Sequence, residues 1–330
     1  MTGRSVADLK EIVQLIEDDL AKVEDFFEEQ VRSDIPLIAE VGRYIRDGGG
    51  KRIRPALLLL SCRLSGYRGD RAILLAAVVE FIHTATLLHD DIIDQATVRR
   101  GRRSVNSRWG NDLTVLLGDF LYTKSMAMAL SQDNLRILRL LSDVTLAMIE
   151  GEILEIERCA DLRVTPDDHL DIIKRKTAAL FSASLRIGGM LGELGEAKER
   201  ALASYGLNLG ICFQMVDDLL DFTADEKVLG KPTANDLREG KLTLPVIFLL
   251  RRAGRAGADM VSAVLADRGF ERVSREELVA LAREHGALDE ARVLAERYAE
   301  QARQDLAGFD RSPYREALAI LPDFILARDH

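Results

Sequence analysis

The chain has 330 residues, a length that suits one large domain or two modest ones. Its net charge is −9 and its pI is near 5.3, which argues against a general nucleic-acid-binding protein, because such proteins carry a basic excess. The cysteines Cys62, Cys159 and Cys212 are far apart and lack CxxC spacing. Neither a disulfide framework nor a zinc site is therefore expected, and a cytoplasmic location is the simplest.

The N-terminal stretch MTGRSVADLKEIVQLIEDDL is charged and amphipathic, without the pattern of a secretory signal. The most apolar window, residues 72–88, contains Glu80 and His83, which make it a poor membrane span. The sequence therefore predicts a soluble protein without an integral membrane segment.

Almost every segment shows the periodicity of amphipathic helices, beginning with residues 6–29. The loop GGGKRIR precedes a second run, which Pro55 opens. Further helices are predicted over residues 71–94, 112–130, 134–158, 167–192, 197–224, 243–254, 275–286, 288–307 and 312–328. Strand-like alternation is almost absent, so we expect a single all-α domain spanning residues 1–330, with long polar loops at 95–110 and 225–242.

Two acidic clusters end apolar helical runs. LLHDDIID contains Asp90, Asp91 and Asp94, and FQMVDDLLD contains Asp217, Asp218 and Asp221. Carboxylates three or four residues apart share one helix face, about 5–6 Å between Cβ atoms, where their repulsion calls for a cation. A solvated helix end would account for one such cluster. The two together favour Mg²⁺, which binds through one or two carboxylates plus waters and substrate phosphates.

Basic residues suited to phosphate lie near both clusters in the sequence. GGGKRIRP places Lys51, Arg52 and Arg54 ahead of a helix start, although a basic surface loop would look the same. The other basic candidates are Arg99, Arg100, Lys176, Lys231 and Lys241. P-loop, GxGxxG, GxSxG and metal-spaced His/Cys patterns are absent, so the residues predict an anion held through Mg²⁺ and clamped by Arg and Lys.

In their order along the chain, GGGKRIRP, LLHDDIIDQATVRRG, the Lys-Thr at 176–177, FQMVDDLLD and GKPTANDLREGKLTLP strongly resemble the trans-polyprenyl diphosphate synthases. The similarity begins near residue 30 and reaches the terminal LPDFILARDH. It implies a helical bundle of the isoprenoid-synthase type, with the two acidic clusters facing each other across a deep central cavity. It also implies a Mg²⁺-dependent prenyltransferase, active as a homodimer, that joins isopentenyl diphosphate to an allylic diphosphate.

The resemblance assigns roles residue by residue. Metal ligands would be Asp90, Asp94, Asp217 and Asp221, and the catalytic set Asp90, Asp91, Asp94, Lys176, Asp217 and Asp218. Isopentenyl diphosphate would be bound by Lys51, Arg54, His83 and Arg100, and the allylic diphosphate by Arg99, Lys176, Thr177, Gln214, Lys231 and Lys241. One departure is visible, because Glu155 stands where the family often has glutamine, and the role of that position is left open.

The product length is argued from the helix that ends in Asp90. Residues facing the cavity should include Val78, Phe81 or Ile82, and Ala85. Short-chain members of the family close this pocket with a bulky aromatic near the position of Ala85. A small residue there favours a long-chain product, heptaprenyl to decaprenyl, of the kind used for quinone side chains, although Phe81 could set a floor lower down.

Four alternatives remain open from the sequence. The protein could be a short-chain farnesyl or geranylgeranyl diphosphate synthase, or a non-catalytic subunit of a heteromeric synthase. A terpene cyclase or a head-to-head synthase would share the helical fold and the first acidic cluster, but cyclases normally carry a different second metal motif and lack the GGGKRIRP site. A purely structural helical protein would have no use for the matched acidic and basic residues.

Overall fold

The computed structural model describes residues 5–223 and 234–328. The helices that lead to the first acidic cluster are α1 (Ser5–Gln14), α2 (Glu17–Gln30), α3 (Pro36–Asp47), α4 (Ile53–Leu64) and α5 (Arg71–Ile93). The middle of the chain forms α6 (Val105–Trp109), α7 (Asn111–Leu130), α8 (Leu135–Glu157), α9 (Pro166–Ile173), the π-helical turn η1 (Lys174–Ala178), α10 (Ala179–Leu191) and α11 (Glu196–Thr223). The remaining helices are α13 (Asn235–Arg238), α14 (Leu244–Ala253), α15 (Arg255–Asp267), α16 (Arg275–Glu284), α17 (Ala287–Asp305) and α18 (Pro313–Leu326).

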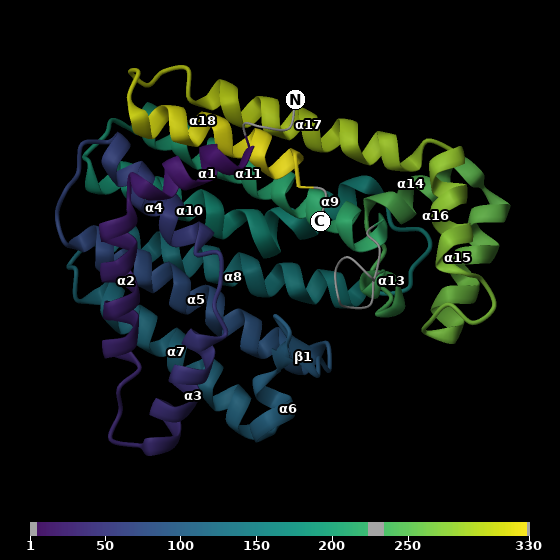
Figure 1. The fold of residues 1–330 in the computed structure, drawn as a ribbon, viewed down its shortest axis with the longest axis horizontal. Coiled ribbons are helices and arrows are strands. Elements are labelled where there is room, and N and C mark those ends of the chain that lie inside the picture. The colour runs from purple at the N-terminus through teal and green to yellow at the C-terminus, as the bar shows by residue number, and fades with distance from the viewer. Residues whose placement is uncertain (1–4, 224–233, 329–330) are drawn as a thin grey trace. The chain divides into compact units, whose positions relative to one another are not determined.

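The all-α class is confirmed, and the strands found in the described residues are the short pair β1 (Val98–Arg99) and β2 (Arg102–Arg103) (Figure 1). The single helix predicted over residues 6–29 is wrong, because the chain breaks between α1 and α2 at Ile16, which caps α2 with a φ of −136°. Three acids follow Ile16 in the first turn of α2, where the helix dipole favours negative charge.

The prediction of two long polar loops was only partly correct. Residues 95–110 contain the hairpin β1–β2 and helix α6, and α13 lies in the described part of 225–242. Helices α3 and α15 were also missed. Helix α3 begins at Pro36, whose fixed φ suits the first helical position, and its buried residues include Val41 and Gly42.

By its internal contacts the chain divides into two compact units, each described separately. Unit 1 comprises residues 1–145, 183–203 and 309–318, and unit 2 comprises residues 146–182, 204–308 and 319–330. The single domain over residues 1–330 stays a prediction.

Helix α5 forms the centre of unit 1. It packs against α7, α4 and α2 (Figure 1), and every residue from Leu75 to Ile82 is buried. A helix that is apolar on all sides is stable only inside a core, which explains why the run looked so apolar in the sequence. Helices α4 and α10 approach closely at Gly188, where a Cβ would lie 2.5 Å from the Ser61 side chain. The acidic C-terminal end of α5 therefore continues a helix whose preceding turns are buried in the core.

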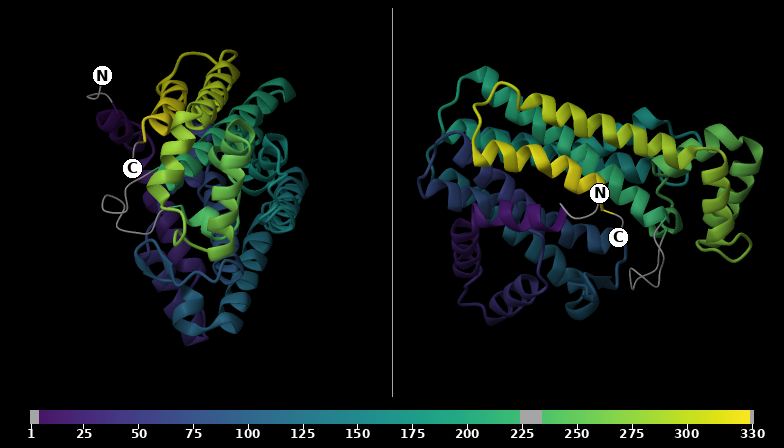
Figure 2. Two further views of the ribbon diagram at one scale, coloured as in Figure 1. Left: turned by 90° about the vertical axis from the view of Figure 1, so that its right-hand side faces the viewer. Right: turned by 45° about the horizontal axis from the view of Figure 1, so that its top comes forward.

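Unit 2 is built around the helix pair α14 and α17. Five alanines of α17 are fully buried at helical spacing, so the two helices can approach closely: Ala287, Ala291, Ala295, Ala299 and Ala302. Helices α15 and α16 lie side by side and both contact α14 (Figure 2).

The π-helical turn η1 is held tightly within unit 2. A Cβ on Gly151 of α8 would lie 2.8 Å from the Lys176 backbone nitrogen, and one on Gly210 of α11 would lie 2.7 Å from the Ala178 Cα. Both positions therefore require glycine. Because π-helical turns occur mostly as single insertions, often at functional sites, the residues of η1 are candidates for a functional role.

Among the described residues, α5 and α7 are the helices long and apolar enough to cross a membrane by length and composition. This is weak evidence, because the core helix of a water-soluble protein passes the same test, and the α5 window is 67% buried.

Candidate active site

The first acidic cluster lies at the C-terminal end of α5, where Asp94 is the C-cap residue. Asp90 and Asp94 are partly exposed, whereas Asp91 is buried, with 3% of its surface accessible. Arg99 donates to Asp91 Oδ1 from Nε at 2.7 Å and from Nη2 at 2.5 Å. Burial raises the pKa of Asp91 and the Arg99 contact opposes this rise. Asp91 therefore anchors Arg99, and Asp90 and Asp94 present the accessible carboxylates.

The hairpin β1–β2 carries the arginines that follow this cluster. Its turn residues Arg100 and Gly101 have φ values of 53° and 73°, as a two-residue hairpin turn of type I′ requires. Arg100 Nη1 donates to the carbonyl oxygen of Gly49, and a Cβ on Gly50 would lie 2.8 Å from that nitrogen. The hairpin thus brings Arg100 into contact with the glycine-rich loop ahead of α4. The resemblance predicts that Arg100 and residues of this loop bind the same diphosphate.

A buried basic cluster lies beneath this contact. Burial lowers the pKa of Arg54 to about 10, with Glu80 opposing the change and Arg100 adding to it. Burial first, and then Arg54, Arg100, Arg99 and Arg52, lower the pKa of His83 well below its usual value, so His83 is neutral at pH 7. Of the predicted isopentenyl diphosphate ligands, Arg54, His83 and Arg100 therefore lie together, and Lys51 is exposed at the loop.

Arg52, a basic residue of the GGGKRIRP motif, belongs to the same cluster, and so does Glu80, which was not predicted as a site residue. Arg52 Nη1 donates to Glu80 Oε1 at 2.6 Å, and the Glu80 side chain is 5% exposed. Arg52 also pairs with Glu24 of α2, whose side chain is 38% exposed. Glu80 thus supplies a buried negative charge to three guanidinium groups. Its occurrence in an apolar run, three residues before His83, was the signal that could have found it.

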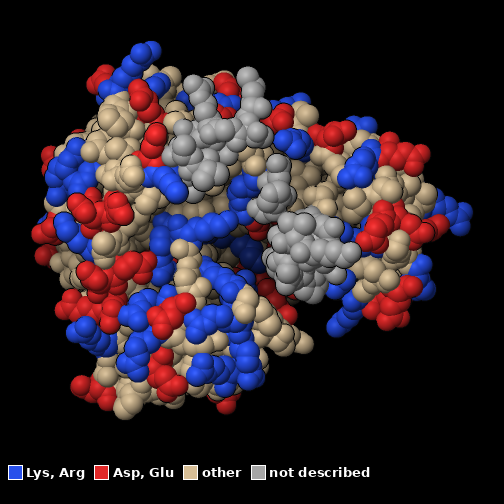
Figure 3. All heavy atoms as spheres, viewed as in Figure 1, with Lys and Arg blue, Asp and Glu red and all other residues tan. Residues whose placement is uncertain are grey.

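A cavity of about 70 Å³ lies beside the basic cluster. Its lining includes Arg52, Thr84, Asp91, Arg99, Arg100 and Arg103. Its outer wall contains Tyr44, whose hydroxyl donates to the Arg103 carbonyl at 2.7 Å and whose ring lies 4.9 Å from that of Trp109. The guanidinium carbons of Arg102 and Arg108 lie 4.3 and 4.7 Å from the Tyr44 ring centre. Lys and Arg side chains gather over this part of the surface (Figure 3).

The second acidic cluster, on α11 in unit 2, separates into differently placed carboxylates. Asp217 is exposed and accepts from Arg328 Nη2 at 3.2 Å. Asp218 is 2% exposed and accepts from the Gln214 side chain at Oδ1 and from His169 at Oδ2, both at 2.9 Å. Asp221 Oδ2 accepts from the backbone nitrogen of Asp236 at 3.2 Å. Asp217 and Asp221, four residues apart, are therefore the pair suited to a metal, and Asp218 is held by protein groups on both oxygens.

The π-helical turn η1 brings two further predicted residues to this cluster. The Thr177 hydroxyl donates to Gln214 Oε1 at 2.9 Å. Lys176 Nζ lies 2.6 Å from Glu152 and 2.5 Å from Glu155, and Lys241 Nζ lies 3.9 Å from Glu155. Glu155, the departure from the family pattern, therefore pairs with one of the two lysines and lies near the other. Lys231 lies outside the described residues.

A cavity of about 100 Å³ joins these groups. It is lined by Glu155, His169, Ile172, Ile173, Lys176, Thr177, Gln214, Asp218, Asp236, Lys241 and Thr243. Burial, and then the nearby Asp221 and Asp218, raise the pKa of Asp236 well above its usual value. His169 and Asp236 are titratable lining residues that were not predicted as site residues. Asp236 lies within the motif GKPTANDLREGKLTLP, whereas His169 belongs to none of the quoted motifs.

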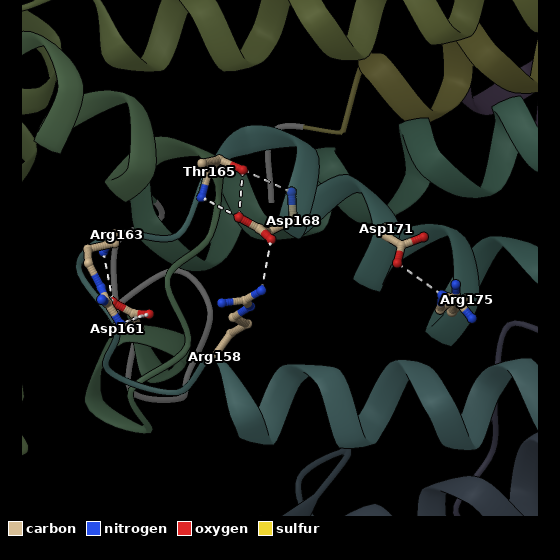
Figure 4. A network of polar contacts seen from close by, with 7 residues as sticks. All are labelled: Arg158, Asp161, Arg163, Thr165, Asp168, Asp171 and Arg175. Atoms are coloured by element: carbon tan, nitrogen blue, oxygen red, sulfur yellow. Dashed lines mark hydrogen bonds and ion pairs between the residues drawn. The ribbon is translucent and has the colours of Figure 1, made fainter.

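Helix α9, which carries His169, is fixed by polar contacts near both of its ends (Figure 4). Thr165 and Asp168 form a capping box at its start, and Arg158 at the end of α8 lies 3.3 Å from Asp168. Beyond its end, Arg175 pairs with Asp171 at 3.0 Å and with Glu150 of α8 at 2.5 Å. These contacts set the position of α9 and η1 against α8.

The donor chemistry suits a hard divalent cation. Within residues 10–223 and 234–328, no three His, Cys, Asp or Glu side chains form a group that could hold a metal ion by itself. Mg²⁺ takes few protein carboxylates and completes its shell with waters and substrate phosphates. The carboxylates predicted to bind the metal are Asp90 and Asp94 in unit 1 and Asp217 and Asp221 in unit 2.

Helices that carry paired carboxylates, with guanidinium and ammonium groups nearby, suit a class of enzymes that bind phosphorylated substrates through Mg²⁺. Comparison with known proteins makes the class specific, because the model of the polyprenyl synthetase family matches residues 35–281. The chain belongs to the polyprenyl synthetase family and is a prenyltransferase. Members of this family generally use a divalent metal.

Relatives of known name agree with this assignment. The octaprenyl diphosphate synthase of Escherichia coli K12 is 38% identical over 97% of this chain and 99% of its own length. A decaprenyl diphosphate synthase from Rhodobacter capsulatus has a similar structure, with a TM-score of 0.92 and 39% identity, covering 97% of this chain and 99% of that one. A polyprenyl synthase from Caulobacter crescentus, complexed with calcium and isoprenyl diphosphate, also gives a TM-score of 0.92, with 37% identity over 97% and 98% of the two chains.

Proposed function

We propose that the protein condenses isopentenyl diphosphate head-to-tail with an allylic diphosphate, and that it makes a long-chain all-trans polyprenyl diphosphate, heptaprenyl to decaprenyl, for quinone side chains. The observation that carries this proposal is that basic residues suited to a diphosphate occur in both units. In unit 1 they form the buried arginine cluster around Arg54, and in unit 2 they are Lys176 and Lys241, which line a cavity. A condensing enzyme needs to hold two diphosphates at once, whereas a cyclase holds one.

The family resemblance assigns the allylic diphosphate to Arg99, Lys176, Thr177, Gln214, Lys231 and Lys241, of which Lys176, Thr177, Gln214 and Lys241 line the unit 2 cavity. Asp90, Asp94, Asp217 and Asp221 would hold Mg²⁺, which when bound supplies positive charge to the departing diphosphate. Lys176 pairs with Glu152 and Glu155. An incoming diphosphate therefore has to compete with these carboxylates for the ammonium group. Thr177 and Gln214 are already joined by a hydrogen bond, which reduces the ordering that binding requires.

Isopentenyl diphosphate is assigned to Lys51, Arg54, His83 and Arg100. The buried guanidinium groups would bind its phosphate oxygens strongly, because charge-assisted hydrogen bonds are strongest where water is excluded. The neutral imidazole of His83 can donate a hydrogen bond without adding to the repulsion among the arginines. In the proposed reaction, loss of diphosphate leaves an allylic cation, the alkene attacks it, and a proton is lost from the adduct. The released diphosphate is the candidate base.

The product tail is assigned to the side of α5 that carries Val78, Phe81, Ile82 and Ala85. All four residues are buried, with at most 3% of their surface accessible. The Phe81 ring packs on Phe27 of α2 with ring centres 4.3 Å apart, so α2 contributes to the surroundings of this side of α5. Ala85 lies five residues before Asp90, about 7.5 Å along the helix axis, where a short-chain member of the family would carry a bulky aromatic.

We further propose a soluble, cytoplasmic homodimer. Helix α8 exposes Leu146, Ile149, Ile153 and Ile156 by 58%, 52%, 58% and 54%. Their spacing of three and four residues places them on one face of the helix, and a continuous apolar stripe of this kind favours a protein interface. A second copy of the chain is the proposed occupant. Light scattering during gel filtration should give twice the mass of 36.7 kDa, and Ile153→Glu should shift the protein toward the monomer. A monomeric wild-type protein would contradict the proposal.

The function is tested by incubating the protein with isopentenyl diphosphate, geranyl or farnesyl diphosphate and Mg²⁺, followed by mass spectrometry of the dephosphorylated products. Products of seven to ten isoprene units are expected. Shorter products would favour a farnesyl or geranylgeranyl diphosphate synthase, and no product would favour a non-catalytic subunit. Asp90→Ala and Asp217→Ala should each remove most turnover while the helical circular dichroism signal remains, because each cluster repels itself and loses one charge without unfolding.

A further inference from the structure

A histidine that belongs to none of the family motifs contacts the second acidic cluster. His169, on α9, is 7% exposed, and its Nε2 lies 2.9 Å from Oδ2 of the buried Asp218. A carboxylate removed from water is costly unless each oxygen finds a hydrogen-bond donor. In this structure the second oxygen of Asp218 accepts from Gln214, so His169 supplies the remaining donor.

Further hydrogen bonds connect Asp218 to Gln214 and Thr177, two residues that are proposed to bind the substrate. Asp218 fixes the amide nitrogen of Gln214, and this leaves the amide oxygen facing the Thr177 hydroxyl at 2.9 Å. Three hydrogen bonds thus connect His169, Asp218, Gln214 and Thr177 in sequence. They link α9, α11 and η1, and all four residues line the same cavity. Without the His169 donor, Asp218 would be free to rotate away from Gln214, and the amide could turn over.

The position of His169 itself leaves little freedom. It directly follows Asp168, which forms the capping box of α9 with Thr165 and an ion pair with Arg158 (Figure 4). The imidazole therefore belongs to a helix end whose position is fixed by contacts other than those of His169. A residue that orients other side chains needs such support.

We propose that His169 is a positioning residue for the allylic diphosphate: by donating to Asp218 it fixes the side chains of Gln214 and Thr177 in the orientation that binds the substrate. This inference rests on the proposed function and adds to it a residue outside the matched motifs. Partners that orient ligating groups typically contribute about 10–100-fold to activity or affinity, and this sets the expected effect.

The test compares three variants of one residue. The amide nitrogen of His169→Gln can occupy the place of Nε2 and donate to Asp218, that of His169→Asn is too short to reach it, and His169→Leu has no donor. His285→Leu is the matched control, since His285 is a partly buried histidine in the same unit, at the C-cap of α16. For each variant, kcat and both KM values are measured for a single condensation, and calorimetry measures the binding of inorganic diphosphate with Mg²⁺.

We expect His169→Leu and His169→Asn to lose about 10–100-fold in kcat/KM for the allylic diphosphate and to bind inorganic diphosphate more weakly. The KM for isopentenyl diphosphate should not change, and His169→Gln and the control should retain most of the activity. If His169→Leu does not fold, the pair His169→Gln and His169→Asn carries the comparison.

Unchanged allylic kcat/KM in folded His169→Asn, or an equal loss for both substrates in all three variants, would overturn the inference. An inactive wild-type protein would instead refute the proposed function, so the two failures are distinguishable.

Discussion

The buried carboxylate of Glu80 offers a sharp test of how the arginine cluster is stabilised. Arg52 pairs with two glutamates that differ in burial, since the Glu80 side chain is 5% exposed and that of Glu24 is 38% exposed. Glu80→Gln and Glu24→Gln remove one negative charge each from the same guanidinium group and keep the side-chain shape. They therefore form a matched pair in which burial is the main variable.

The expected magnitudes follow from this difference. Removing one partner of a buried ion pair costs about 3–5 kcal/mol, because an uncompensated charge remains in the interior. Glutamine still accepts a hydrogen bond from Arg52, and Glu24 remains as a partner, so the lower end, about 3 kcal/mol, is expected for Glu80→Gln. The exposed pair with Glu24 should be worth less than about 1 kcal/mol.

Thermal unfolding followed by circular dichroism measures both effects. At about 2 °C per kcal/mol for a chain of this size, Glu80→Gln should lower Tm by about 6 °C and Glu24→Gln by at most about 2 °C. Isopentenyl diphosphate should raise the Tm of Glu80→Gln more than that of the wild type, because the ligand replaces the lost negative charge. Equal losses of Tm in the two variants would refute the reasoning that burial determines the strength of the Glu80 pair.

Three further predictions address the substrate sites. Ala85→Phe should shorten the product without abolishing the first condensations, since the ring blocks the tail below the metal ligands; an unchanged product length by mass spectrometry would show that Ala85 does not face the tail. Because the pKa of His83 is lowered on folding, the unfolded chain takes up the proton first, and stability should fall as the pH drops below about 6.5, by up to about 1.4 kcal/mol per pH unit. His83→Gln should therefore show a smaller difference in Tm between pH 7.5 and pH 5.5 than the wild type, and an identical difference would contradict this origin. Arg54→Ala should chiefly raise the KM for isopentenyl diphosphate, and Lys176→Ala should chiefly raise the KM for the allylic diphosphate. Equal changes of both KM values in both variants would contradict the assignment of the two substrates to different residues.

The periodicity of the sequence located the long helices well, because each of them keeps one kind of residue on one face over many turns. Helix α5 was predicted as residues 71–94 and extends over Arg71–Ile93. Periodicity could not locate the break at Ile16, since apolar residues continue at helical spacing across it and only the backbone of one residue departs from the helix. Short elements such as α6 and β1 were missed because they contain too few residues to show a period.

The candidate site also contains residues that the sequence could predict and residues that it could not. Paired aspartates and basic loops were recognised because their chemistry is local in the sequence. Glu80 and His169 were missed because each depends on a partner far along the chain: the Arg52–Glu80 contact spans 28 residues, and the His169–Asp218 contact spans 49. Glu80 stands out in the sequence only as a charge within an apolar run, and His169 has no neighbour in sequence that would single it out. Their roles follow from burial and hydrogen bonding, which the fold creates.

Trp109 is the sole tryptophan of the chain, and its place beside the hairpin has a spectroscopic consequence. The guanidinium carbon of Arg108 lies 4.3 Å from its ring centre, and Tyr44 links the ring to the strand that carries Arg103. Intrinsic emission on excitation near 295 nm therefore comes from one indole at the edge of the arginine-lined cavity. Any ligand that moves the hairpin should change the intensity or the wavelength of this emission. Binding of a ligand to the unit 1 site could thus be followed without a label, in a titration that does not require the second substrate or any turnover.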